Sequence, residues 1–212
     1  TFPRTVTLDK QFRMHPELGD FVSRNFYESH GDPTISAGKK DHEFFHDIPG
    51  YEGRVLAWFD IPKGSEKQSK QKSWYRKSEA RAIAKEIKRV VNHESSLTFG
   101  VISFYLEQVK EIWKALLDEG LAEEVEGEYR LIKSLRSTEK NGEITEKLRI
   151  GTVDAFQGLE FDCVMLSVVR SNTIELTEDE KTWRQKFGFL MLENRSCVAM
   201  SRQQRLLIVF GD

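Results

Sequence analysis

The stretch that most constrains the fold is IGTVDAFQGLEFDCVMLSVVR, residues 150–170. One apolar strand enters it, and a second, at 162–169, leaves it. A short turn rich in polar residues lies between the two. Polar groups held between two buried strands usually line the edge of a sheet where a ligand sits. This pattern predicts a binding edge within the stretch.

Its expected partner is the last stretch, CVAMSRQQRLLIVFGD, residues 197–212, where Arg202 and Arg205 immediately precede an apolar strand. A third arginine, Arg13, lies just ahead of a helix that begins at Pro16. A helix N-terminus is electrostatically unfavourable for a cation, so an arginine there suggests an anionic ligand. Such arginines can stabilise a transferring phosphoryl group, a role worth roughly 10³–10⁵ in rate. Ordinary surface ion pairing is the open alternative.

Apolar runs and helical periodicity alternate along the chain. Strands are expected at 54–61, 97–105, 148–153, 162–169 and 205–210, helices at 16–26, 78–91 and 106–119, and a short strand and helix at 189–200. The later strands are almost continuously apolar, which is typical of a parallel sheet covered on both faces. Two polar segments, 121–147 and 171–187, are expected to be surface insertions.

Composition bounds the remaining possibilities. The 212 residues, 39% of them hydrophobic, suit one domain with its own core. With 32 basic and 34 acidic residues the chain is no polycation, so any nucleic-acid contact must come from a local surface. Cys163 and Cys197 cannot form a disulfide framework. No signal peptide is visible and no apolar run approaches the roughly 20 residues of a membrane span, so we expect a cytoplasmic (intracellular) monomer with no membrane partner.

Two local motifs leave alternatives open. The segment 63–77 holds six basic residues and one acid and ends near Trp74 and Tyr75, which suits either single-stranded nucleic acid or a solvated hairpin. His42 to His46 matches H-E-x-x-H, a zinc-hydrolase signature that needs a long helix and a third ligand. Glycine and proline on either side leave room for little more than two helical turns. We expect no metal site, and analysis of bound metal distinguishes the two interpretations.

Four segments in the same order resemble motifs of superfamily 1 helicases, in the branch of the nonsense-mediated-decay helicase and senataxin: QFRMHP at 11–16, VISFYLEQV at 101–109, GTVDAFQGLEFD at 151–162 and VAMSRQQR at 198–205. The resemblance implies an α/β, RecA-like three-layer domain with a central, mostly parallel sheet. Residues 1–212 would form the second motor domain, with 1–30 as its entry segment. No G-x-x-x-x-G-K-[ST] occurs, so the domain would lack the P-loop.

The resemblance also implies roles for individual residues. Arg202, as the principal finger, and Arg13 would reach the γ-phosphate of ATP. Residues beside the nucleotide would be Gln157, Gly158, Glu160 and Arg205. Residues contacting the backbone of single-stranded RNA or DNA would be Thr152, Ser103 and Arg170. The P-loop and the ligands of Mg²⁺ would belong to an N-terminal RecA-like domain preceding Thr1, so the fragment alone is expected to be inactive.

The sequence departs from the family pattern near its end. Leu159 stands where the family often has arginine, Cys197 replaces an asparagine, and Gln203 and Gln204 replace a small residue and a basic one. The changes in the last of the four motifs favour an alternative function: a degenerate helicase-like module that binds nucleic acid or protein without ATP turnover. The intact Arg13, Gln157, Glu160 and Arg202 oppose it.

Overall fold

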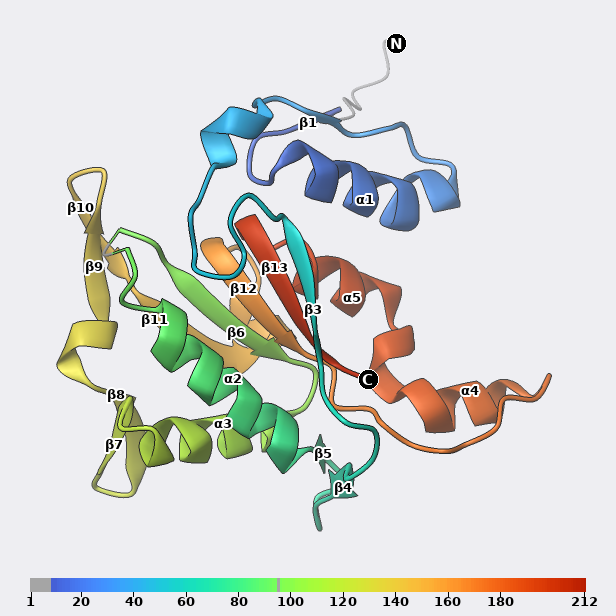
Figure 1. The fold of residues 1–212 in the computed structure, drawn as a ribbon. Coiled ribbons are helices and arrows are strands. Elements are labelled where there is room, and N and C mark those ends of the chain that lie inside the picture. The colour runs from blue at the N-terminus through green and yellow to red at the C-terminus, as the bar shows by residue number, and fades with distance from the viewer. Residues whose placement is uncertain (1–8, 95) are drawn as a thin grey trace, which may run out of the picture.

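The computed structural model describes residues 9–94 and 96–212, and at its centre is a five-stranded sheet (Figure 1). All neighbouring strands run parallel, in the order β11-β6-β12-β13-β3. The strands are β3 (Leu56–Asp60), β6 (Phe99–Ser103), β11 (Leu148–Thr152), β12 (Phe161–Ser167) and β13 (Gln203–Gly211). Each expected strand of this sheet is present, with ends shifted by one or two residues.

Helices cover both faces of the sheet, giving three layers (Figure 1). On one face α2 (Lys77–Val90) and α3 (Leu106–Asp118) contribute buried side chains such as Ile87 and Ile112, which join Val101 of the sheet in one core cluster. On the other face lie α1 (Pro16–Phe26) and α5 (Glu193–Ala199), whose core cluster includes Ile102. The α/β, RecA-like class expected from the sequence is confirmed.

The continuous apolar runs have a direct structural cause. Every residue of β6 and β12 is buried, because successive side chains point to opposite faces and both faces are covered. Gly100 of β6 leaves room for the side chain of Phe156. A Cβ added there would lie 2.8 Å from the ring of Phe156.

The two polar insertions differ in structure. Segment 121–147 forms two antiparallel hairpins, β7 (Ala122–Val125) with β8 (Glu128–Leu131) and β9 (Ser137–Lys140) with β10 (Glu143–Glu146), joined by the 3-10 helix η3 (Lys133–Leu135). Segment 171–187 ends in α4 (Glu180–Phe187).

The strand expected within 189–200 was wrong. A 3-10 helix, η5 (Gly188–Met191), leads into α5 instead, and Phe189 stacks on Tyr105 with ring centroids 5.3 Å apart. The aromatic contact holds the segment against the sheet without any strand pairing.

Small elements complete the chain: β1 (Lys10–Gln11) pairs with β2 (Ser36–Ala37), and the lysine-rich segment forms a hairpin of β4 (Lys67–Gln68) and β5 (Trp74–Tyr75). Short 3-10 helices are η1 (Glu28–His30), η2 (Asp41–Phe44) and η4 (Val153–Phe156). Among the described residues, no helix combines the length and apolarity needed to cross a bilayer.

Candidate functional site

The residues singled out in the sequence fall at opposite edges of the sheet. Glu160 and Arg202 each precede the first residue of a strand, and those first residues, Phe161 and Gln203, lie side by side in the register. Thr152 and Ser103 are register partners at the carboxyl ends of β11 and β6. The segment 152–160 therefore runs from one edge to the other, linking a candidate nucleotide edge to a candidate nucleic-acid edge.

At the amino edge, Ser201 holds two arginines close together. Arg202 donates from Nη2 to the Ser201 hydroxyl at 2.7 Å and from Nε to the carbonyl of Val198 at 3.1 Å. Arg13 donates from Nη1 to the Ser201 carbonyl at 3.3 Å and from Nε to Glu160 at 2.9 Å. Glu160 thus pairs with one of the two guanidinium groups that Ser201 holds.

This arrangement leaves an excess of positive charge. Burial lowers the pKa of Arg202, and the neighbouring charge of Arg13 lowers it further. The repulsion between two like charges held by a neutral serine falls when an anion binds between them. The pair is therefore suited to a phosphate group.

The QFRMHP segment is folded by its own first side chain. The Gln11 amide oxygen accepts from the backbone nitrogens of Arg13 at 3.0 Å and Met14 at 2.8 Å, and its nitrogen donates to the Met14 carbonyl at 2.9 Å. Helix α1 approaches this turn through Gly19, where an added Cβ would lie 2.5 Å from the Gln11 amide nitrogen. The turn aims Arg13 at the edge of the sheet.

His15 fastens the same turn to the helix and to the sheet. Its Nδ1 accepts from the Glu17 nitrogen at 3.2 Å and so caps α1, and its backbone nitrogen donates to the Gln204 carbonyl at 2.8 Å. This backbone bond brings the N-terminal segment against the start of β13.

Gln157 and Gly158 are exposed beside Glu160. Gly158 has φ +83°, a left-handed conformation that favours glycine, so the backbone turns sharply before β12. Gln204 donates to Glu160 at 2.7 Å and holds that carboxylate in place.

Arg205 lies slightly deeper, in a charge network around Asp162. Asp162 accepts from Arg205 at 2.8 Å and from Lys140 of the β9–β10 hairpin at 2.6 Å. Burial alone would raise the pKa of Asp162, but the bonds from Lys140 and from Thr98 and Arg205 outweigh it and lower the pKa. Lys140 also lies 3.4 Å from Gln204. Sequence reasoning missed this lysine because it comes from an insertion with no motif around it.

The carboxyl edge holds the residues predicted to contact nucleic acid. Ser103 is fully buried, and its hydroxyl accepts from the Tyr105 nitrogen at 3.3 Å, which is a local capping role. Thr152 is half-buried and makes no side-chain capping bond to η4. Its hydroxyl remains the better placed of the two for a backbone contact.

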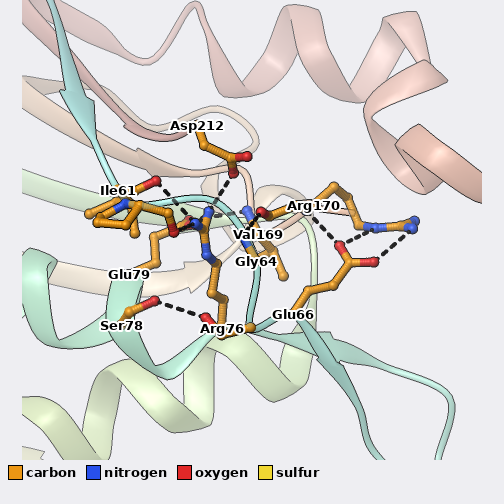
Figure 2. Close-up of polar contacts among 12 residues, drawn as sticks. Ile61, Gly64, Glu66, Arg76, Ser78, Glu79, Val169, Arg170 and Asp212 are labelled. Atoms are coloured by element: carbon orange, nitrogen blue, oxygen red, sulfur yellow. Dashed lines mark hydrogen bonds and ion pairs between the residues drawn. The ribbon is translucent and has the colours of Figure 1, made fainter. Parts of the chain in front are cut away.

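Arg170 is held in an unusual turn (Figure 2). Its nitrogen donates to the Val168 carbonyl at 2.7 Å around Val169, whose φ of +68° is strained for a β-branched residue. The guanidinium pairs with both oxygens of Glu66, at 3.0 and 3.3 Å, and its side chain is only 3% exposed. A direct contact with phosphate, as predicted, would require this ion pair to open.

A buried network that sequence reasoning did not find supports this turn (Figure 2). Glu79 of α2 accepts from the Ser167 hydroxyl at 2.5 Å and from the Val169 nitrogen at 3.1 Å. Arg76, fully buried at the start of α2, donates to Asp212 at 2.8 Å and lies 3.5 Å from Glu79. Burial raises the pKa of Glu79 to about 7.

The H-E-x-x-H match lacks the geometry of a zinc site. It begins on η2, a 3-10 helix of four residues, rather than on a long α-helix. His46 is buried, with one ring nitrogen 2.7 Å from the Arg54 carbonyl and the other 3.4 Å from the Ile48 nitrogen, while His42 is exposed. Within 9–94 and 96–212, no group of three metal-ligating side chains is assembled.

Comparisons with known proteins place the chain in a family. A family model described as "AAA domain" matches residues 3–212. The chain is 27% identical over 209 residues to helicase sen1 of Schizosaccharomyces pombe, covering 97% of this chain and 10% of that protein. It is 28% identical over 213 residues to a regulator of nonsense transcripts 1 homolog of Neurospora crassa, covering 98% of this chain and 16% of that protein.

A solved structure, the C-terminal domain of a possible DNA helicase from Lactobacillus plantarum, aligns with a TM-score of 0.48 and 11% identity, over 95% of this chain and 87% of that one. The chain thus spans between a tenth and a sixth of the length of these two curated relatives.

Proposed function

The chain belongs to the AAA domain family, as the second motor domain of a superfamily 1 helicase, and from this membership we propose that it serves an ATP-dependent helicase or translocase. ATP, with Mg²⁺, would bind at the cleft with an N-terminal RecA-like domain of the same protein. Arg202 and Arg13 would supply the fingers, while Gln157, Gly158, Glu160 and Arg205 would lie beside the nucleotide.

The single observation that carries this proposal is the pair of guanidiniums on Ser201. The two oxygens of Ser201 hold both guanidiniums, and Glu160 pairs with Arg13, so a γ-phosphate entering from the partner domain would complete their charge balance. Because the residues of this chain include no P-loop, hydrolysis would need both domains, and residues 1–212 alone would be inactive.

A single strand of RNA or DNA would be gripped at the opposite edge, through Thr152, Ser103 and Arg170. The segment 152–160 spans the two edges. Closure of the cleft on ATP would therefore move the backbone that touches the strand, which is a physical route for coupling hydrolysis to translocation.

The test is the ATPase activity of the full-length protein, with and without single-stranded nucleic acid, for wild type, Arg202→Ala and Arg24→Ala. Arg24 is the control, since it is an exposed arginine on α1 whose ion pair, within the described residues, is with Asp20 of the same helix. We expect stimulated activity that falls roughly 10³-fold or more in Arg202→Ala and is unchanged in Arg24→Ala.

An active protein indifferent to Arg202→Ala would refute the finger assignment. A protein that binds the strand without any turnover would instead select the degenerate binding module.

A further inference from the structure

The lysine-rich hairpin β4–β5 is fastened to the carboxyl edge of the sheet. The guanidinium carbon of Arg170 lies 4.5 Å from the ring centroid of Trp74 in β5. Glu66, beside β4, pairs with the same guanidinium. Glu66 also accepts from the Ser171 nitrogen at 2.6 Å. A basic, aromatic segment is thus placed next to the end of β12 instead of being left in solvent.

A cavity of about 280 Å³ lies beside this junction. The hairpin forms one side of it and contributes Lys72 and Trp74. The α4–η5 segment forms the other side and contributes Arg184 and Phe189. Tyr105 and Arg170 line it as well. We propose that this cavity binds an unpaired base of a single nucleic-acid strand, an inference that rests on the proposed function and adds a base-binding subsite to it.

The lining is rich in planar groups. Tyr105 and Phe189 stack at an interplanar angle of 21°, and the Arg170 guanidinium lies over the ring of Trp74. Unpaired bases bind to such surfaces because every base has a π-face, so aromatic rings and guanidinium planes hold them regardless of sequence. The volume, just under the roughly 300–1,000 Å³ of typical small-ligand sites, suits a single base.

The walls of the cavity are built before any ligand enters. Arg170 is fixed by Glu66 and donates to the Gln185 carbonyl, and the Tyr105 hydroxyl accepts from the Phe189 nitrogen at 3.2 Å. Gly188 lets η5 approach the Tyr105 hydroxyl, since a Cβ there would lie 2.5 Å from that oxygen. A rigid site loses little conformational entropy on binding.

Charge at the rim favours a polyanion. Lys72 is exposed at the turn of the hairpin and has no ion pair within the described part of the chain. Arg184 is exposed on the opposite side, where it pairs with Glu180, so Lys72 is the rim charge that a phosphate would meet first. The cavity also adjoins the predicted backbone contacts, since Arg170, one of those residues, is part of its lining. A strand lying along this edge would place its phosphates near the rim and one base inside.

The experiment measures binding of the full-length protein to labelled single-stranded oligonucleotides, RNA and DNA, and to an oligonucleotide of equal length that lacks bases throughout. The variants are Phe189→Leu, which removes a ring while keeping apolar bulk, and Lys72→Ala. Phe21→Leu is the control for the ring, being 40% exposed on α1 against 44% for Phe189. Lys67→Ala is the control for the charge, because it removes an exposed lysine of the same hairpin outside the cavity.

We expect Phe189→Leu to weaken binding of base-containing strands about fivefold or more and to leave the abasic strand unaffected. Lys72→Ala should weaken binding of both kinds of strand, and both controls should match wild type. Loss with RNA alone, or with DNA alone, would identify the strand that the cavity takes.

Wild-type binding that does not distinguish base-containing from abasic strands, or that is indifferent to Phe189→Leu, would overturn the subsite while leaving the proposed grip on the backbone intact. Absence of any binding by wild type would overturn the grip itself and the subsite with it.

Discussion

Glu79 offers a quantitative test of the network behind the carboxyl edge. The perturbation is Glu79→Gln, which keeps the size of the side chain and an oxygen to accept from Ser167 and Val169. Burial raises the pKa of Glu79 from 4.5 to about 7, with Arg76 lowering it and Asp212 raising it by smaller amounts. Glutamine has no proton to gain or lose over this range.

The sign and size follow from proton linkage. Between pH 4.5 and about 7 the folded protein holds a proton on Glu79 that the unfolded chain has lost, so this group makes stability fall as pH rises. At 1.36 kcal/mol for each pH unit, the full effect is about 3 kcal/mol. Roughly 2–3 kcal/mol of it should develop between pH 5 and pH 8.

The assay is urea unfolding of wild type, Glu79→Gln and Glu124→Gln at pH 5, 6, 7 and 8. Glu124, an exposed acid on β7, is the control. Other titrating groups are common to all three proteins, so the difference between wild type and Glu79→Gln isolates this carboxyl. We expect the free energy of unfolding of wild type to fall with pH relative to Glu79→Gln. Parallel pH profiles would mean that Glu79 is ionised in the folded protein and that the reasoning is wrong.

Two further predictions concern the other buried groups. Asp162→Asn should lower the free energy of unfolding at pH 7 by roughly 2–3 kcal/mol, below the usual 3–5 for a broken buried pair because Lys140 and Arg205 are 25% and 24% exposed. Since folding lowers the pKa of Asp162, its ionised form stabilises the folded protein above about pH 4, and this stabilisation is lost as the pH falls further. The free energies of unfolding of wild type and variant, measured in urea, should therefore converge at low pH. Burial raises the pKa of both cysteine thiols, completely buried Cys163 the more. A thiol reagent at pH 8 should modify half-buried Cys197 in the native protein and Cys163 only after unfolding; equal native rates would contradict this, and Cys197→Ser assigns the signal.

Local patterns determined the elements of this fold. The uninterrupted apolar runs of β6 and β12 predict buried parallel strands because a strand covered on both faces needs apolar side chains at every position. The motif order predicted the family, and the family match over residues 3–212 confirms it. The strand expected within 189–200 was wrong because a short apolar run does not by itself specify a strand. There Phe189 packs on Tyr105 from a 3-10 helix, without pairing to a neighbouring strand.

The pairing of those elements was decided only by the tertiary structure. Arg13 meets Ser201 across 188 residues, and Arg170 is neutralised by Glu66 across 104, contacts that no spacing in the sequence records. They follow from the strand order β11-β6-β12-β13-β3, which sends the predicted nucleotide residues to one edge and the nucleic-acid residues to the other. Sequence by itself determined which residues carry charge, hydroxyls and rings and which must be buried. The assembly of the sheet and of the helices on it determined which of them meet, because burial, ion pairing and strain depend on neighbours that are distant along the chain.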